Sequence, residues 1–199
     1  MSLFITFEGP DGAGKSTQVE LLRAALADRS PLVVREPGGT ELGERVREVL
    51  LHGGSASAEA EMLLFMAARA ELLAELIRPA LEAGRIVIAD RYHDSTLAYQ
   101  GGGRAIETWW PADFPRPQRT FLLRLPSPEA GFERMRGAGK RADRMESAGL
   151  EFHRRVVEEY DRLAAGDPSR WVVLDATRSP EEVHAGVMTA LESLLVPVS

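Results

Sequence analysis

The stretch FITFEGPDGAGKSTQ, residues 4–18, decides the fold class of this chain. It satisfies the phosphate-loop motif G-x-x-x-x-G-K-[ST] without exception, at Gly9, Gly14, Lys15 and Ser16. An apolar run precedes the motif and a helical pattern follows it, which is the strand–turn–helix context that the motif requires. The stretch therefore predicts an α/β domain that binds a polyphosphate.

The glycines of this loop let main-chain N–H groups converge on a β-phosphate at the N-terminus of the following helix. Lys15 can neutralise the β- and γ-phosphate oxygens, and Ser16 can bind Mg²⁺. The residues predicted to bind the nucleotide are Gly9, Pro10, Asp11, Gly12, Ala13, Gly14, Lys15, Ser16 and Thr17. A second GAGK, residues 137–140, lacks the other residues of the motif and is predicted to be a mobile basic loop.

Short apolar runs alternate with helical patterns along the rest of the chain. The helical patterns cover residues 58–82, 146–165 and 180–195, and residues 101–119 read as a loop whose two tryptophans pack rather than react. Strands that alternate with helices form parallel sheets covered on both faces. We therefore predict one α/β domain over residues 1–199 with a five-stranded parallel sheet. The predicted strands are 3–7, 32–34, 86–89, 120–125 and 171–174.

Composition excludes several classes of protein. The 199 residues are 44% hydrophobic, which suits one domain, and the absence of cysteine excludes disulfides and thiol nucleophiles. The net charge of −6 argues against a general nucleic-acid binder, which has a basic face. Apolar runs fall far short of the roughly 18 residues of a membrane span, and the first residues lack the basic region of a signal peptide. We expect a cytoplasmic protein that binds neither nucleic acid nor membranes.

A phosphate loop can serve a switch, a motor or a transferase. A Ras-type switch reads guanine through an Asn-Lys-x-Asp element, and this chain contains no asparagine. A motor normally carries larger coupling domains than 199 residues allow. The remaining reading is a small kinase with a P-loop kinase fold.

Polar residues follow the predicted strands at the edge where an open parallel sheet binds its ligands. Asp90 can hold Mg²⁺ there, and the neighbouring Arg91 can bind a phosphate. REPGGT, residues 35–40, supplies an arginine, a proline and two glycines at another strand end. This segment must turn sharply to face a second substrate, and we predict a cis bond between Glu36 and Pro37 because X–Pro bonds become cis at small cost.

At this point the chain resembles the bacterial thymidylate kinases over nearly its whole length. The resemblance rests on FEGPDGAGKST, REPGGTELGERVREVLL, LLFMAARAEL, ADRYHDSTLAYQGGGR, ADRMES and FHRRVVEEYDRLA, which occur in the family's order. REPGGT and DRY…STLAYQG are specific to this family among P-loop kinases. The resemblance implies Mg²⁺-dependent transfer of the γ-phosphoryl group of ATP to dTMP, a role in dTTP synthesis, and a homodimer.

The resemblance also implies roles for individual residues. Phe65 matches the ring that stacks on thymine, Arg69 the donor to the base O4, and Tyr99 the ring that favours deoxyribose. The implied dTMP-binding residues are Asp11, Arg35, Pro37, Phe65, Arg69, Arg91, Thr96, Tyr99 and Gln100. The implied catalytic residues are Lys15, Arg91 and Arg141, and the implied metal ligands are Ser16 and Asp90.

The resemblance implies a short mobile lid at about 134–146, where Lys140, Arg141 and Arg144 would surround the phosphates. Which of these cations contacts the transferred phosphoryl group is left open. The chain departs from the family at Gln118, Arg119 and Arg124, which stand where the family has other residues.

The acceptor in such a reaction is a phosphate monoester with a second pKa of about 6, so it is ionised at neutral pH and needs no general base. Two alternatives stay open. A deoxynucleoside kinase would phosphorylate a hydroxyl and need a carboxylate base, and a nucleotide-binding regulatory protein would form no ADP with dTMP. If Arg69 donates to the base O4, we expect the preference dTMP, then dUMP, then dCMP.

Overall fold

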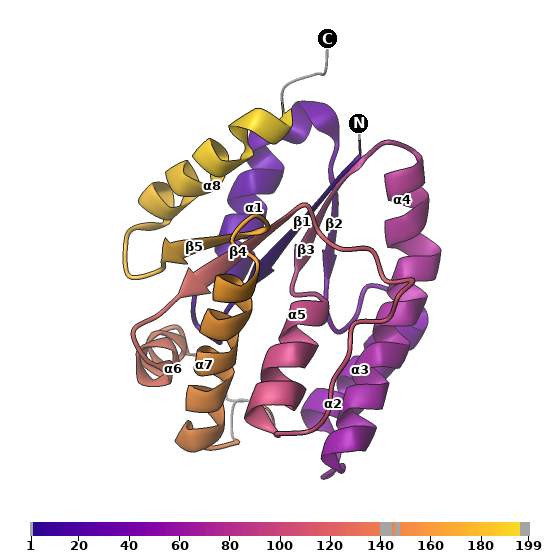
Figure 1. The fold of residues 1–199 in the computed structure, drawn as a ribbon, viewed down its shortest axis with the longest axis vertical. Helices are drawn as coiled ribbons and strands as arrows, with labels where there is room; N and C mark the ends of the chain where they lie inside the picture. The colour runs from indigo at the N-terminus through magenta and orange to yellow at the C-terminus, as the bar shows by residue number, and fades with distance from the viewer. Residues whose placement is uncertain (1, 140–144, 146–147, 196–199) are drawn as a thin grey trace.

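The computed structural model describes residues 2–139, 145 and 148–195 (Figure 1). The described residues form a five-stranded sheet in the order β2-β3-β1-β4-β5, and all of its paired strands are parallel. This confirms the predicted α/β fold, and each predicted strand end lies within one residue of its place in the structure. The strands are β1 (Leu3–Glu8), β2 (Leu32–Arg35), β3 (Ile86–Asp90), β4 (Arg119–Arg124) and β5 (Trp171–Asp175).

Helices cover both faces of this sheet (Figure 1). The described α-helices are α1 (Lys15–Ala25), α2 (Glu41–His52), α3 (Ala58–Leu72), α4 (Arg78–Glu82), α5 (His93–Thr96), α6 (Pro128–Gly137), α7 (Leu150–Gly166) and α8 (Pro180–Leu195). A short 3₁₀ turn, η1 (Ala27–Arg29), follows α1, and two π-helical segments, η2 (Leu73–Ile77) and η3 (Leu97–Gly103), follow α3 and α5. No helix among these has the length and apolar character needed to cross a membrane.

The two faces of β1 have different partners because side chains alternate along a strand. Leu3, Ile5 and Phe7 pack in the cluster that includes residues of α1 and α8. Phe4 packs on the other face with residues of α3, η2 and α4. Glu8 lies on that second face too, in the part that α7 and η3 cover. A charged residue therefore ends the central strand there.

The helix predictions were partly right. The pattern 180–195 coincides with α8, and the pattern 58–82 is α3, η2 and α4 in succession. The predicted helix 146–165 begins only at Leu150 among the described residues. The predicted loop 101–119 was wrong at its start, because residues 101–103 belong to η3. Glycine is needed there: a Cβ at 102 or 103 would meet side chains of α7 at 2.5 Å.

Three residues that depart from the resembling family make contacts of their own. The side-chain oxygen of Gln118 accepts a hydrogen bond from the Phe4 N–H at 2.6 Å. Arg119 donates to the Ser169 carbonyl at 2.6 Å, and Arg124 pairs with a carboxylate of α7 at 2.9 Å. These contacts tie β4 to β1 and to the segments that flank it.

Candidate active site

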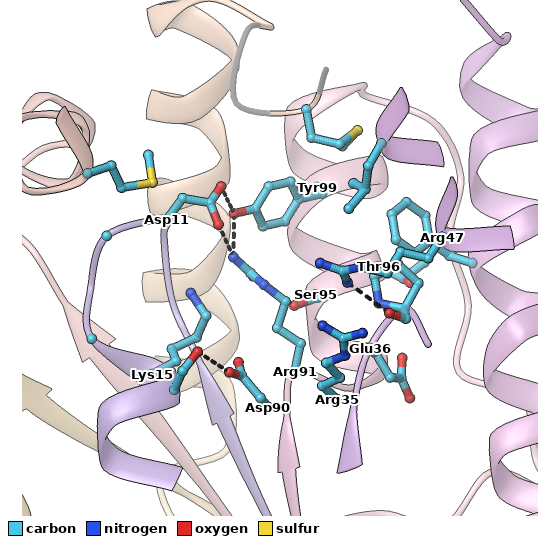
Figure 2. Close-up of a pocket in the computed structure, with 18 of the residues that line it drawn as sticks. Asp11, Lys15, Arg35, Glu36, Arg47, Asp90, Arg91, Ser95, Thr96 and Tyr99 are labelled. Atoms are coloured by element: carbon cyan, nitrogen blue, oxygen red, sulfur yellow. Dashed lines mark hydrogen bonds and ion pairs between the residues drawn. The ribbon is translucent and has the colours of Figure 1, made fainter. Parts of the chain in front are cut away.

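A cavity of about 440 Å³ opens at the carboxyl edge of the sheet (Figure 2). The phosphate loop follows β1 there, and Arg35 and Asp90 end β2 and β3. Parallel strands end at one edge, so residues far apart in sequence meet around this cavity. The predicted site residues that line it are Asp11, Gly12, Gly14, Lys15, Ser16, Thr17, Arg35, Pro37, Phe65, Asp90, Arg91, Thr96, Tyr99 and Gln100.

The phosphate loop is shaped by glycines with positive φ. Gly9 and Gly12 have φ of 133° and 76°, where side chains with a Cβ are strained. A Cβ at Gly9 would also meet the Leu123 carbonyl oxygen at 2.6 Å. Gly9, Pro10 and Ala13 belong to the loop but do not line the cavity among the described residues. These three residues therefore contribute to the shape of the loop and not to the surface of the cavity.

Lys15 begins α1 and folds back onto its own loop. Its Nζ donates to the carbonyl oxygens of Gly9 at 3.1 Å and Pro10 at 2.8 Å. Burial lowers the pKa of Lys15 to about 8, with a further lowering from Arg91 and opposition from nearby carboxylates such as Asp11. A bound polyphosphate would add negative charge beside the ammonium group and favour its protonated form.

Ser16 and Asp90 form a pair of oxygen donors beside the loop. The Ser16 hydroxyl donates to Asp90 Oδ2 at 2.6 Å. Magnesium prefers oxygen ligands and is commonly held by one or two protein groups together with substrate phosphates. Across residues 2–139, 145 and 148–195, no cluster of three or more His, Asp or Glu side chains could hold a metal ion by itself. The pair therefore fits a magnesium ion that a nucleotide also binds.

Arg91 lies at the centre of the cavity and joins the loop to the following helix. Its Nη2 donates to Asp11 Oδ1 and, at 3.0 Å, to the Tyr99 hydroxyl, which in turn donates to Asp11 Oδ2 (Figure 2). Burial opposes the charged form of Asp11, but Arg91, Lys15 and the Tyr99 hydroxyl together hold its pKa below the usual value. Asp11 is therefore a carboxylate at neutral pH.

The segment after β2 supplies another cation and a turn. The Glu36–Pro37 bond is cis, as predicted, and the Pro37 carbonyl accepts a hydrogen bond from Arg47 of α2 at 2.9 Å. Arg35 lines the cavity and pairs with Glu44 at 3.1 Å, with its side chain 56% exposed. Both arginines line the cavity.

The far end of the cavity is lined by Phe65, Thr96 and Gln100. The Gln100 amide donates to Glu61 at 2.9 Å, and this carboxylate is 1% exposed. Such a donor arrangement leaves the Gln100 oxygen as the acceptor that the side chain can offer a ligand. A ring, a hydroxyl and an amide suit a flat heterocycle with polar edges.

Arg69 does not line the cavity among the described residues, in contrast to the other residues predicted to bind dTMP. It is 1% exposed, and its guanidinium pairs with Glu36 at 2.6 Å and donates to Thr96 Oγ1 at 2.9 Å. Its predicted contact with the base stays a prediction. The structure shows Arg69 behind Thr96, which does line the cavity.

The predicted catalytic Arg141 and the lid cations Lys140 and Arg144 lie outside the described residues. The predicted lid, about 134–146, starts within α6, since residues 134–137 form the last turn of that helix. The predicted mobile loop 137–140 likewise starts at the last residue of α6.

Sequence reasoning missed Arg47 and Ser95, which also line the cavity. Helical spacing within 41–52 could have placed Arg47 one turn from Gly43, on the side that packs near Pro37. Ser95 belongs to the motif DRYHDSTLAYQ, residues 90–100, and directly precedes Thr96, a predicted dTMP-binding residue.

Three comparisons with known proteins point to one family. The family model "Thymidylate kinase" matches residues 7–187. The chain is 50% identical to the thymidylate kinase of Thermomicrobium roseum, with 98% of this chain and 97% of that protein covered. It is 46% identical to that of Bifidobacterium longum subsp. infantis, with 97% and 87% covered. The crystal structure of thymidylate kinase from Ehrlichia chaffeensis superposes with a TM-score of 0.75 at 31% identity and covers 96% of this chain and 98% of that one. The chain belongs to the thymidylate kinase family.

Proposed function

We infer that this chain is a dTMP kinase, which transfers the γ-phosphoryl group of ATP to dTMP and releases ADP and dTDP. Family membership over nearly the whole chain supports this activity. One observation of the structure supports the inference for this molecule: the residues of one cavity include the phosphate loop, Phe65 and Gln100. Arg91 lies at the centre of this cavity (Figure 2).

At the nucleotide end, we propose that the loop from Gly9 to Thr17 binds the phosphates of ATP through its main-chain N–H groups and the N-terminus of α1. Lys15 would leave its loop carbonyls for the β- and γ-oxygens. Ser16 and Asp90 would hold Mg²⁺, which neutralises charge on those phosphates when it is bound. The hydrogen bond between these two oxygen donors supports this assignment.

At the centre, we propose that Arg91 and Arg35 bind the phosphate of dTMP. This phosphate needs no base because it is already ionised near neutral pH. The obstacle is repulsion between two anions, and a planar guanidinium relieves it by binding phosphate oxygens in pairs. Lid residues, Arg141 among them, would complete the cationic shell. Asp11 would meet the sugar 3′-hydroxyl, and the Tyr99 ring would crowd the 2′ position.

At the far end, Phe65 would stack on thymine while Thr96 and Gln100 meet its polar edge. Arg69 would contact the O4 atom directly only after its hydrogen bond to Thr96 is exchanged. Pro37 would close the pocket from the β2 side, since it lines the same cavity.

We also propose that two copies of the chain form a homodimer, as the resemblance implies. Val49 of α2 and Leu63 of α3 support an interface on these two packed helices, because each is more than half exposed. Light scattering would measure the mass in solution. A mass of one chain at micromolar concentration would contradict this proposal.

The test is a coupled assay of ADP formation with Mg·ATP and either dTMP or thymidine. With Mg·ATP present, we expect ADP formation with dTMP and none with thymidine. A deoxynucleoside kinase would need a basic carboxylate at the hydroxyl, and the low pKa of Asp11 beside Arg91 makes it a poor base. Turnover with thymidine would favour that alternative. Formation of no ADP with either compound would favour a non-enzymatic nucleotide-binding protein.

The Lys15→Ala variant extends this test. It should lower kcat by about 10²-fold or more with the circular dichroism spectrum unchanged, because it removes a cation that acts on the transferred group. Arg23→Ala is the matched control, since Arg23 lies on the same helix in an exposed pair with Glu20. Near-normal turnover of Lys15→Ala would refute the assignment of the loop.

A further inference from the structure

Glu8 is a buried acid that the proposed mechanism does not use. It ends β1 directly before the phosphate loop, is 0% exposed and does not line the cavity among the described residues. Its Oε1 accepts from the Tyr92 N–H at 2.7 Å, and its Oε2 accepts from the Ser95 hydroxyl at 2.6 Å and the Tyr160 hydroxyl at 2.8 Å. Burying a carboxylate is unfavourable unless hydrogen bonds compensate it, and these bonds offset part of that cost.

The same two hydroxyls also contact Arg91. Its Nη1 donates to Ser95 Oγ at 3.1 Å and to the Tyr160 hydroxyl at 3.2 Å. A hydroxyl has one hydrogen to donate and lone pairs to accept. When each hydroxyl donates to the carboxylate, its lone pairs are available to the guanidinium. The charge state of Glu8 therefore sets whether the hydroxyl hydrogens point toward Glu8, which leaves the hydroxyl lone pairs free to accept from Arg91.

The backbone around Arg91 depends on the same acid. Arg91 has φ of 71°, in the left-handed region that residues with a Cβ avoid. Its own N–H donates to the Phe7 carbonyl, and the next N–H, of Tyr92, donates to Glu8. The end of β1 thus holds the peptide on both sides of Arg91.

We propose that Glu8 is a positioning residue for Arg91. Acting through Ser95, Tyr160 and the Tyr92 N–H, it holds the guanidinium where the phosphate of the acceptor binds. The inference rests on the proposed function, because it concerns the cation that the proposed mechanism places against dTMP.

The pH dependence gives an independent readout. The groups that face Glu8 are Arg91, Asp94 and Ser95 after β3, Tyr160 on α7, and Lys15 on the loop side. Burial and the Asp94 charge raise the pKa of Glu8 to about 7, while Arg91 and the two hydroxyls oppose this rise. A protonated Glu8 offers a hydrogen where the hydroxyls need an acceptor. The hold on Arg91 should therefore weaken below that pH.

The test uses Glu8→Gln in the full-length protein. The amide donates where the carboxylate accepted, so the hydroxyls turn their hydrogens toward Arg91 and face its N–H groups. We expect kcat/KM for dTMP to fall by about 10- to 100-fold, as for a small displacement of a catalytic group, while KM for ATP changes by less than about threefold. Wild-type kcat/KM should decline below pH 7 more steeply than that of the variant. Glu8→Asp, which keeps the charge, should recover part of the loss.

A double-mutant cycle separates positioning from general structural damage. In an Arg91→Ala background, Glu8→Gln should lower kcat/KM by less than about threefold, because the residue through which it acts is gone. Thr6→Val is the matched control: Thr6 is buried on the same face of β1 and bonds to Thr120, and its loss should leave kinetics unchanged. Losses that multiply in the double variant would overturn the proposal.

Two further outcomes are decisive. If Glu8→Gln does not fold, Tyr160→Phe removes one of the two hydroxyl links and should raise KM for dTMP without altering KM for ATP. Normal kinetics of Tyr160→Phe and of Ser95→Ala would overturn the proposal. Absence of dTMP-dependent ADP formation in the wild-type protein would instead refute the proposed function, so the two failures can be told apart.

Discussion

An arginine at position 69 is among the largest fully buried side chains of the molecule. Its partner Glu36 is buried too, and the cost of burying each charge is offset by their pairing at 2.6 Å. Arg69→Ala should therefore lower the free energy of unfolding by about 3–5 kcal/mol, because it leaves Glu36 buried without its cation. Urea unfolding would measure this. Arg45→Ala, at a fully solvated pair on α2, should change stability by less than about 1 kcal/mol.

The same residue bears on the choice of base. Thymine O4 accepts hydrogen bonds, whereas the cytosine amino group donates them, so a donor at this edge of the pocket rejects dCMP far more strongly than dUMP. We expect the preference dTMP, then dUMP, then dCMP. In the folded fraction of Arg69→Ala, the dTMP/dCMP ratio of kcat/KM should decrease more than the dTMP/dUMP ratio.

Thr96→Val tests whether that selectivity passes through the residue in front of Arg69. Thr96 lines the cavity and accepts from Arg69. If both variants reduce all three substrates equally, position 69 supports the fold alone, and the prediction that it reads the base is wrong.

Site residues differ in how far sequence could predict them. Asp90 and Arg91 follow an apolar run, so their place at the edge of the sheet follows from the topology alone. The burial of Arg69 depends on Glu36, thirty-three positions earlier, and no local pattern shows that pairing. The link from Glu8 to Tyr160 spans 152 positions and is equally hidden. Local chemistry was predictable, and buried partners from distant elements were not.

At the scale of elements, the phosphate loop and α6 touch backbone to backbone. A Cβ on Gly131 would lie 2.1 Å from the Asp11 carbonyl oxygen, so Gly131→Ala must push α6 away from the loop. Overpacking of this kind costs about 1–3 kcal/mol, and we expect kcat/KM for ATP to fall by roughly fivefold or more. Steady-state kinetics with varied ATP would measure it.

Gly166→Ala, at the end of α7, is the control. A Cβ at this position has open space around it, so the variant should keep wild-type kinetics. If the two variants behave alike, contact between α6 and the loop does not matter for nucleotide binding.

Elements were predictable where their hydrophobic pattern was strong. All five strands are apolar runs, and their ends agree with the prediction within one residue. Helix α2 was missed because its buried residues are few and charged ones surround them: only Gly43, Val46 and Leu50 are buried along its described length. The π-helical η3 was missed because its glycines normally favour loops, whereas here they allow α7 to pack closely.

Across the whole molecule, one face of the sheet holds a chain of buried charges. Asp94 pairs with Arg170, which donates also to Thr120 of β4, and the charges of Asp94 and Arg91 both act on Glu8. Breaking such a pair leaves an uncompensated charge, so these groups fix the relation between β5, β4 and the segment after β3. The other face, packed by α1 and α8, is apolar.

This asymmetry predicts how stability depends on pH. Burial raises the pKa of Glu8 from its ordinary value of 4.5 to about 7, so between these pH values the folded protein binds a proton that the unfolded chain has released. Its contribution to stability is present below pH 4.5 and is lost as pH rises through about 7. Relative to Glu8→Gln, which cannot titrate, the wild-type protein should lose free energy of unfolding across this range.

Glu44→Gln is the contrasting control: a hydrogen bond from the Gly39 N–H and the pairing with Arg35 lower the pKa of Glu44, so its contribution is lost only as pH falls below 4.5. Urea unfolding at intervals between about pH 5 and pH 8 measures the free energy of unfolding of each variant. As pH rises, this free energy should decrease in the wild type relative to Glu8→Gln, whereas the difference between wild type and Glu44→Gln should stay constant. A constant difference between wild type and Glu8→Gln would mean that Glu8 has the same pKa in the folded and unfolded chain.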